Sequence, residues 1–422
     1  MNVAVIGSGG REHALCFKLK NSKKLNNLYC IPGNAGTEEI AINIKADISD
    51  FNQLHTIFLD KKIDIILVGP ENPLVDGIVD FFNTKKIKIF GPSKFASQLE
   101  GSKAFLKTLC KENDIPTANF GIFDDIKNIK KFIIKNTLPI VVKADGLASG
   151  KGVTICETRE KAIKACTEIL SGKFKSSSRV VLEEFLIGEE MSYFLIVDKN
   201  VHKFFGSAQD HKRVGEKDTG PNTGGMGAYS PSSIINKELE KKIEKKIILP
   251  TLSAMKKKGH PFKGFLYAGL MIKNNEPFLI EYNVRMGDPE CQTIMTRLES
   301  DLLDIVNYTI DNKLNEIKIN WKREKSLCIV LCSKGYPDKY KKDIKIKNLN
   351  QITINKENFI FHAGTYKKDN DIFSNGGRVL NVISISNNLR NARDKVIFNL
   401  NKLNWRDGFF RKDIGWRSIK NK

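Results

Sequence analysis

The sequence lacks the features that mark membrane and secreted proteins. No run of about 18 apolar residues occurs among its 422 residues, so we expect no membrane-spanning helix. The first residues, MNVAVIGSGG, form a buried-strand pattern followed by a glycine loop, without the basic start and cleavage site of a signal peptide. Hydrophobic residues make up 41% and charged residues 28%, which is typical of a soluble globular chain, and the length predicts about three domains.

Cysteine pairs of the CxxC kind are also missing. Eight cysteines are scattered along the chain, mostly among apolar residues, where a free cysteine behaves as a small hydrophobic residue. Cys328 and Cys332 share one face of the apolar run SLCIVLCS, but no cluster of histidines accompanies them to make a metal site. We therefore expect reduced cysteines in the core of a cytoplasmic protein.

Acidic residues are fewer than basic residues. The chain has 48 Asp and Glu and 69 Lys and Arg, which give a net charge of +21. A basic balance of this size suggests nucleic-acid binding. The lysines, however, are spread through predicted helices and loops, and Asn and Ile, which share A/T-rich codons with Lys, are abundant too. We attribute the positive charge to this codon bias rather than to selection for binding a polyanion. We expect a monomer that acts on small molecules, with no nucleic-acid or membrane partner.

Short apolar strands that end in Gly or Pro recur in the first part of the chain. VAVI, LYCIPG, IDIILVGPE and IKIFGPS alternate with helical stretches, which favours a parallel α/β sheet. Ligands of such sheets bind beyond the carboxyl ends of the strands, where the glycine- and proline-containing loops would lie. We assign residues 1–101 to this N-terminal α/β domain.

A strand–glycine loop–strand unit, IVVKADGLASGKGVTICE, dominates the next block. The later segment SAQDHKRVGEKDTGPNTGGMGAYSP is too long and too poor in apolar residues to be core, and is typical of a functional lid. A lysine-rich helix at about 237–258 and a hairpin that turns at Asn274 and Asn275 follow. We place the central domain at 102–325, with a lid subdomain at about 118–188. Short strands and a final helix at roughly 389–403 predict a C-terminal α+β cap at 326–422.

Two glycine motifs fall short of well-known signatures. GSGGREH has Glu12 where a dinucleotide fingerprint needs its third glycine, and no acid suited to a ribose follows the second strand. What remains is a helix N-terminus that favours an anion, with Arg11 as a forked donor for phosphate. KADGLASGKG is neither a Walker A loop nor a hydrolase elbow, because Ala148 stands where the elbow has serine. Such a loop can still close over a triphosphate, with Lys143 supplying a point charge.

The run IEYNVRMGDPE carries the sharpest local signal. Glu281 and Asn283 are two apart on a predicted strand and therefore project from one face. A carboxylate and an amide oxygen are ligands suited to Mg²⁺ bound with nucleotide phosphates. Arg285 continues that face and could neutralise charge on a transferring phosphoryl group, and Asp288 follows in a turn. The alternative is a polar strand face open to water.

The order of these elements resembles the ATP-grasp superfamily. More closely, GSGGREHA, PGNAGT, QLEGSKAF, KADGLASGKGV, EEFLIGEE, the lid-like segment, RMGDPE, HAGT, GGRVL and RKDIGWR are similar to the phosphoribosylamine–glycine ligase family, over essentially the whole chain. The resemblance implies a central ATP-grasp domain. It also implies ligation of 5-phosphoribosylamine and glycine, through a glycyl phosphate, with ATP cleaved to ADP and phosphate in de novo purine biosynthesis.

The resemblance also implies roles for individual residues. Catalysis would fall to Arg285, Lys143 and Asp288. ATP would be bound by Lys103, Lys143, Lys151, Gly152, Glu183, Phe185, Leu186 and Glu190. The sugar phosphate would be received by Gly9, Gly10 and Arg11, and glycine would be bound or shielded by Asp210, His211 and Arg213. Mg²⁺ or Mn²⁺ would be held by Glu281 and Asn283.

Three alternatives remain open at this stage. One is another ATP-grasp purine ligase, which acts on formate or bicarbonate. The second is a basic nucleic-acid-binding protein, whose retention on DNA would depend steeply on salt. The third is an inactive relative that keeps the motifs without the activity.

Overall fold

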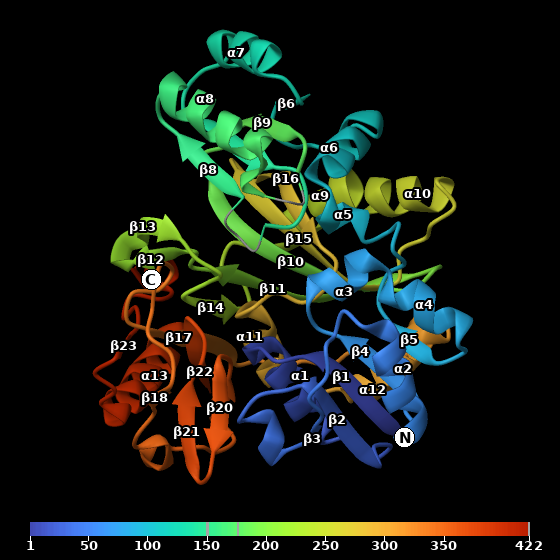
Figure 1. Cartoon of the computed structure of the whole chain (residues 1–422), viewed down its shortest axis with the longest axis vertical. Helices are drawn as coiled ribbons and strands as arrows, with labels where there is room; N and C mark the ends of the chain where they lie inside the picture. The colour runs from blue at the N-terminus through green and yellow to red at the C-terminus, as the bar shows by residue number, and fades with distance from the viewer. Residues whose placement is uncertain (149–151, 175–176, 421–422) are drawn as a thin grey trace.

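Five parallel strands form the N-terminal part of the protein (Figure 1), whose computed structural model describes residues 1–148, 152–174 and 177–420. In sheet order they are β3 (Ile42–Asn43), β2 (Asn27–Pro32), β1 (Asn2–Gly7), β4 (Ile65–Val68) and β5 (Lys88–Phe90). The connecting helices are α1 (Gly10–Leu19), α2 (Phe51–Asp60), α3 (Glu71–Asp76) and α4 (Ile78–Thr84). All four pairings are parallel, which confirms the predicted α/β sheet.

A four-stranded antiparallel sheet forms a separate layer at the top of Figure 1. It is preceded by α5 (Gln98–Gly101) and α6 (Lys103–Glu112). In sheet order its strands are β6 (Phe120–Phe123), β9 (Val180–Glu184), β7 (Ile140–Ala144) and β8 (Val153–Cys156), and its helices are α7 (Ile126–Lys135) and α8 (Arg159–Glu168). Ile133 of α7 and Cys166 of α8 share a hydrophobic cluster with Val142 and Leu182 of the sheet. This layer, which falls in the predicted lid subdomain at about 118–188 and is called the lid layer below, therefore has a core of its own.

One long antiparallel sheet connects the central region to the C-terminal region. In order its strands are β16 (Glu276–Asn283), β15 (Gly264–Lys273), β10 (Glu189–Val197), β11 (His202–Asp210), β14 (Gly227–Ser230), β17 (Lys325–Ser333), β22 (Arg378–Ser386) and β19 (Asn358–His362), with β23 (Gly408–Phe409) beside β17. Smaller strands are β12 (Arg213–Gly215), β13 (Thr219–Asn222), β18 (Ile344–Lys345), β20 (Thr365–Lys368) and β21 (Asp371–Ser374). The main sheet thus continues across residue 326, and the domain division made there stays a prediction.

Several elements of this region agree with the sequence prediction. The hairpin β15–β16 turns at Asn274 and Asn275, whose φ angles of 52° and 58° suit asparagine in a tight turn. The final helix, α13, spans Leu389–Leu403. The lysine-rich helical region consists of α9 (Lys237–Ile243), a π-helical turn (Glu244–Ile248) and α10 (Leu249–Lys257). The remaining helices are α11 (Glu290–Arg297), α12 (Leu302–Ile310) and α14 (Trp416–Lys420).

The polar segment 207–231 is not a lid throughout, and that prediction is wrong for its two ends. Residues 207–210 complete β11, and residues 227–230 form β14, which is fully buried in the main sheet. Burial is possible because the polar groups satisfy one another: Gln209 Oε1 accepts hydrogen bonds from Tyr229 at 2.6 Å and from Ser232 at 3.1 Å. Only the hairpin β12–β13, between these two strands, is a small two-stranded excursion from the sheet.

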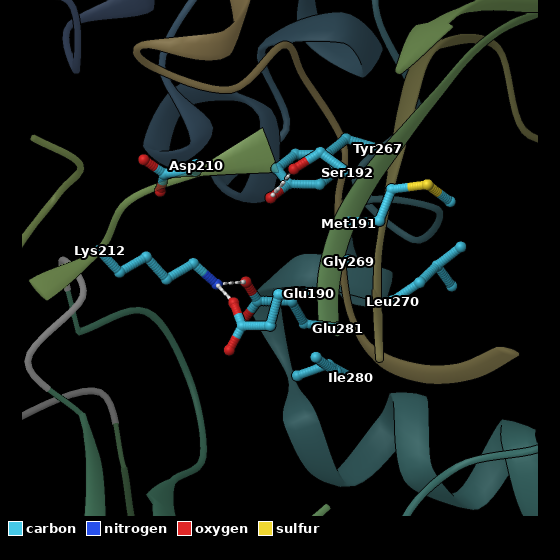
Figure 2. Close-up of a pocket in the computed structure, with 10 residues that line it drawn as sticks. All are labelled: Glu190, Met191, Ser192, Asp210, Lys212, Tyr267, Gly269, Leu270, Ile280 and Glu281. Carbon is cyan, nitrogen blue, oxygen red and sulfur yellow. Dashed lines mark hydrogen bonds and ion pairs between the residues drawn. The ribbon is translucent and has the colours of Figure 1, made fainter. Parts of the chain in front are cut away.

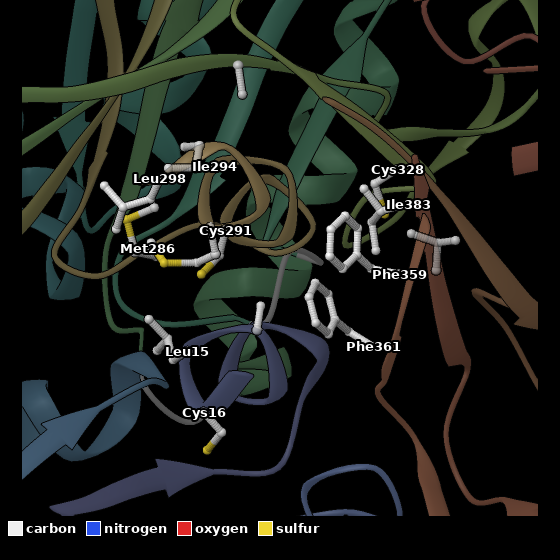
Figure 3. Close-up of a cluster of buried hydrophobic side chains, with 14 of the residues drawn as sticks. Leu15, Cys16, Met286, Cys291, Ile294, Leu298, Cys328, Phe359, Phe361 and Ile383 are labelled. Carbon is white, nitrogen blue, oxygen red and sulfur yellow. The ribbon is translucent and has the colours of Figure 1, made fainter. Parts of the chain in front are cut away.

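The largest hydrophobic cluster joins parts of the chain that are far apart in sequence (Figure 3). Leu15 of α1, Ile294 of α11 and Phe361 of β19 belong to it, so the N-terminal, central and C-terminal regions share one core. All eight cysteines are buried and free, as expected. Within the described residues, no helix is both long enough and apolar enough to cross a membrane.

Candidate active site

A cavity of about 740 Å³ is lined by residues of both the lid layer and the main sheet. Its volume lies within the range of small-molecule sites, roughly 300–1,000 Å³. Other lining residues come from α1, α5, α6 and the C-terminal region. Most residues predicted to bind ATP, metal or substrate line it: Arg11, Lys103, Lys143, Gly152, Glu183, Phe185, Leu186, Glu190, Asp210, His211, Arg213, Glu281, Asn283, Arg285 and Asp288. Lys151 lies outside the described residues, and the structure says nothing of it.

Lys143 takes part in a buried charge cluster. Its Nζ lies 2.8 Å from Glu183 Oε1, and Lys107 Nζ lies 3.0 Å from Glu183 Oε2. Burial alone raises the pKa of the Glu183 carboxyl, but the two ammonium groups outweigh it and hold that pKa below its usual value. The cluster has two positive charges and one negative charge, so it can receive an anion such as a nucleotide phosphate. Sequence reasoning missed Lys107, although it follows Lys103 by one helical turn on α6.

The segment after β9 forms a wall of the cavity. Glu184 continues the strand, while Phe185 and Ile187 expose 38% and 73% of their surfaces. An exposed aromatic ring and an exposed aliphatic side chain are suited to a flat heteroaromatic ligand. Glu190, the second residue of β10, lies on the same wall.

Strand β16 presents Glu281 and Asn283 as its alternation predicts. Tyr282 between them points to the other side, where its hydroxyl lies 2.9 Å from Thr251 Oγ1. A β-bulge precedes the pair, because the partner register on β15 shifts between Gly269 and Leu270. Gly269 stands opposite Glu281, and a Cβ there would come within 3.1 Å of Glu281 Cγ. The bulge and the glycine together give the Glu281 side chain room beside the cavity.

Arg285 connects the cavity wall to the N-terminal region. Its Nη2 donates to Glu100 Oε1 at 2.8 Å, and its Nε donates to Glu71 Oε2 at 3.2 Å. Two carboxylates therefore share one guanidinium. Arg285 lowers the pKa of Glu71 to about 2, whereas burial raises the pKa of Glu100 to about 7. Glu71 and Glu100 were not predicted as site residues, because they meet Arg285 only in the folded chain.

The glycine loop after β1 is already bonded to protein carboxylates. Glu12 accepts from the Gly9 N–H at 2.6 Å and from Arg11 Nε at 2.6 Å. Gly10 packs closely against Asn381 of β22, and a Cβ there would overlap the Asn381 amide. Gly9 and Gly10 are not among the residues lining the cavity, whereas Arg11 is. Of this predicted anion site, only the Arg11 side chain faces the cavity.

The three residues predicted to bind glycine differ in their surroundings. Asp210 Oδ1 is buried without a hydrogen-bond partner in the part of the chain described, and burial, with Glu290 nearby, raises the pKa of Asp210 well above its usual value. His211 Nε2 accepts from the Gly415 N–H at 3.1 Å, and burial lowers its pKa to about 4, so the neutral ring joins β11 to the C-terminal segment. Arg213 donates to Gly220 O at 2.8 Å within the β12–β13 hairpin.

Asp288 is held by a residue from the C-terminal region. Arg378 of β22 lies 3.3 Å from Asp288 Oδ1 and donates to the Asp288 and Gly224 carbonyl oxygens at 2.6 and 2.7 Å. Gln292 donates to the same carboxylate at 2.8 Å. Arg378 lies in the GGRVL motif, but its place in the cavity wall was not predicted, because β22 reaches the site only through the shared main sheet.

Lys212 is a further unpredicted cation in the site (Figure 2). Its Nζ lies 3.1 Å from Glu190 Oε2 and 3.8 Å from Glu281 Oε1. The Glu190 carboxylate, more than any other group, holds the pKa of the Lys212 ammonium well above its usual value. A lysine thus faces the carboxylate that the sequence assigned to a metal.

Three family profiles match successive parts of the chain. They are the phosphoribosylglycinamide synthetase N domain at residues 1–100, the ATP-grasp (A) domain at 101–291 and the C domain at 326–417. The protein named phosphoribosylamine–glycine ligase in Brucella melitensis biotype 1 is 46% identical over 421 residues, which cover 100% of this chain and 99% of that protein. The protein of the same name in Haemophilus influenzae is 45% identical over 426 residues, with coverage of 100% and 99%.

Solved structures agree with this relationship. The crystal structure of phosphoribosylamine–glycine ligase from Thermotoga maritima superposes with a TM-score of 0.85 at 32% identity, covering 98% of this chain and 100% of that chain. Biotin carboxylase from Campylobacter jejuni, with a TM-score of 0.76 at 14% identity over 100% of this chain and 95% of that one, shares the fold alone. The chain therefore belongs to the phosphoribosylamine–glycine ligase family, as its motifs indicated, and has the ATP-grasp fold.

Proposed function

We propose that the protein ligates 5-phosphoribosylamine and glycine, cleaves ATP to ADP and phosphate, and so makes glycinamide ribonucleotide for de novo purine biosynthesis. Family membership over the full chain supports the reaction. The structural observation that carries it is the meeting of Lys103, Lys143 and the Glu281–Asn283 pair at one cavity of nucleotide size, although they come from distant segments.

The chemistry needs no nucleophile from the protein. A glycine carboxylate is a poor acylating group, so its oxygen attacks the γ-phosphorus of ATP, ADP leaves, and glycyl phosphate forms. The phosphoribosylamine nitrogen then attacks the carbonyl carbon, loses a proton, and expels inorganic phosphate. Lys143 and Lys103 bind the phosphate oxygens from β7 and α6, where preorganised cations stabilise the charge that develops during transfer. We keep Arg285 and Asp288 as catalytic candidates, each positioned by the partners described above.

The nucleotide is proposed to lie along the hinge between β9 and β10. Phe185 and Leu186 would contact the base, Glu190 would accept from the ribose, and Lys151 and Gly152 would cover the phosphates. Glu183 would act by holding Lys143 in place, since its carboxylate already bonds that ammonium group. The exposed surfaces of Phe185 and Ile187 at this wall support a base-stacking role.

The residues at the end of β16 fit a divalent metal. Glu281 and Asn283 offer a carboxylate and an amide oxygen on one strand face, and both are hard donors. The Glu281 carboxylate already has a cation, Lys212, beside it. When bound, Mg²⁺ or Mn²⁺ would offset the negative charge of the nucleotide phosphates.

Substrate contacts follow from the same wall of the cavity. Asp210, with its unpartnered oxygen, would bind the glycine ammonium group, and Arg213 and His211 would help to enclose it. Gly9, Gly10 and Arg11 would receive the sugar phosphate. A phosphate at the Gly9 N–H would have to displace Glu12, so we expect Arg11 to contribute most of this binding.

We further propose domain boundaries at 101/102 and 325/326 with the lid at about 118–188, a cytoplasmic location, and a monomer without nucleic-acid partners. Free, buried cysteines support a reducing compartment. The lid layer, with its separate hydrophobic cluster, supports the lid boundaries.

A coupled ADP-release assay tests the reaction, with phosphoribosylamine generated in situ. ADP release should rise only when glycine and phosphoribosylamine are both present. Stimulation by bicarbonate or formate in place of glycine would identify a different ligase of this fold. Failure of every carboxylate to stimulate turnover would identify an inactive relative.

A further inference from the structure

Lys212 lies between two carboxylates at the edge of the cavity. Its Nζ is 3.1 Å from Glu190 and 3.8 Å from Glu281, and Figure 2 shows its extended side chain ending between them. Two carboxylates thus share the ammonium group of Lys212 at this edge. The Lys212 side chain is 33% exposed, so it can move without unfolding its surroundings.

Both partners of Lys212 have other tasks under the proposed function, on which this inference rests. Glu281 would hold the metal ion, and Glu190 would accept from the nucleotide ribose. A dication close to Glu281 repels an ammonium group at the same carboxylate. Binding of the metal and the nucleotide therefore weakens the hold of both carboxylates on Lys212, and its ammonium group is then available to another anion in the cavity.

We propose that Lys212 binds the carboxylate of the amino-acid substrate, and that it becomes free to do so only when metal and nucleotide have occupied Glu281 and Glu190. The phosphate oxygens already have Lys103 and Lys143, which reach the cavity from α6 and β7. Asp210, two residues before Lys212, lines the same cavity with an unpartnered carboxylate oxygen. An ammonium group and an unpartnered carboxyl oxygen on one short segment can receive the carboxylate and the ammonium group of a zwitterion.

This arrangement makes the binding order a consequence of charge. In the nucleotide-free protein, Lys212 is paired with Glu190 and Glu281, so an amino-acid carboxylate would have to compete with both of them for its ammonium group. After nucleotide and metal bind, the same location offers a free ammonium group. Glycine binding is therefore expected to depend on prior nucleotide binding, because the competent state of Lys212 is scarce without it.

The test replaces Lys212 by methionine and measures two quantities that should move in opposite directions. The kcat/KM for glycine should fall by about 30- to 100-fold, since a charge-assisted contact to the substrate is lost. Binding of Mn²⁺ with a non-hydrolysable ATP analogue, followed by electron paramagnetic resonance of free Mn²⁺, should tighten by about 3- to 10-fold, because a competing cation is gone.

Lys242→Met is the matched control. The Lys242 ammonium also joins two carboxylates, Glu238 at 2.9 Å and Glu276 at 2.7 Å, but it lies outside the cavity. This variant should leave both quantities unchanged. If Lys212→Met weakened metal–nucleotide binding together with glycine use, Lys212 would only be holding the site together, and the inference would be wrong. An unchanged glycine kcat/KM would overturn it as well.

Wild-type calorimetry gives a second measurement that needs no variant to fold. Glycine should bind measurably in the presence of Mg²⁺ and the ATP analogue, and at least about 10-fold more weakly without them. Equal binding in both conditions would overturn the proposed order. If wild-type ADP release did not depend on glycine at all, the proposed function itself would fail. The inference alone fails if that dependence holds but the Lys212 pattern is absent.

Discussion

Replacing Glu183 by glutamine should destabilise the lid far more than its single lost charge suggests. The Glu183 carboxylate lies between Lys143 and Lys107, at 2.8 and 3.0 Å, and these lysine side chains are only 7% and 2% exposed. Glutamine keeps the size and the carbonyl oxygen but removes the negative charge. Two buried ammonium groups would then face each other without the carboxylate that holds them.

The cost has a calculable ceiling. Removing one partner of a buried ion pair costs about 3–5 kcal/mol. A lysine can instead release its proton, and from an ordinary pKa of about 10.4 this costs about 4.6 kcal/mol at pH 7. We therefore expect a loss of at least about 3 kcal/mol and at most about 4.6 kcal/mol. The control, Lys107→Met, leaves Glu183 and Lys143 as a neutral pair. It loses the Lys107 contacts with Glu183 at 3.0 Å and with Thr117 at 2.6 Å, and we expect this to cost about 1–2 kcal/mol.

The assay is hydrogen exchange of the amides in β7 and β9, because the lid has its own hydrophobic cluster and can open separately. The glutamine variant should lose protection there and recover part of it near pH 10, where one lysine becomes neutral. ATP near 100 times its dissociation constant should restore about 2.7 kcal/mol. A loss below about 1 kcal/mol, or one no larger than that of Lys107→Met, would show that the Glu183 carboxylate is not needed to stabilise the two buried lysines.

Three further predictions concern single residues. Burial raises the pKa of Glu100 to about 7, so its contribution to stability is fully present below about pH 4 and is lost as the pH rises through 7. Relative to wild type, Glu100→Gln should gain about 3 kcal/mol in urea unfolding between about pH 4.5 and pH 8, and an unchanged pH slope would contradict this. Glu281→Ala should slow ADP formation by about a hundredfold or more, about 3 kcal/mol, and lose Mn²⁺ binding, whereas retained turnover would remove Glu281 from the metal site. Asn275→Val should cost about 1–2 kcal/mol in urea unfolding, because φ is 58° at this turn, while Asn275→Gly should cost little.

Local patterns predicted the parts of the site that depend on one element. Strand alternation placed Glu281 and Asn283 on one face, and the Tyr282 hydroxyl on the opposite side agrees with it. The Asn274–Asn275 turn and the parallel N-terminal strands were likewise predictable from spacing and residue type. Such features need only the backbone geometry of a single strand or hairpin.

Features that depend on partners from distant segments were not predictable. Lys107 and Lys212 look like ordinary surface lysines until the fold brings them to Glu183 and Glu281. The ends of the polar segment 207–231 were misread for a related reason. A segment with few apolar residues is expected to be exposed only if its polar groups would lack hydrogen-bond partners in the interior. The folded protein supplies Gln209 with several such partners, so its strand can be buried.

The continuity of the main sheet decides where this protein tolerates engineering. β14 has β11 on one side and β17 on the other, so cutting the chain near residue 326 would strip one edge of a buried strand and invite aggregation. The lid offers the opposite case. Thr117 pairs with Leu279 on β16, and β10 starts at Glu189 beside β15, so both ends of the lid leave from one side of the same sheet. Residues 118–188 could therefore be exchanged between relatives as one segment, whereas the rest of the chain should be kept together from a single relative.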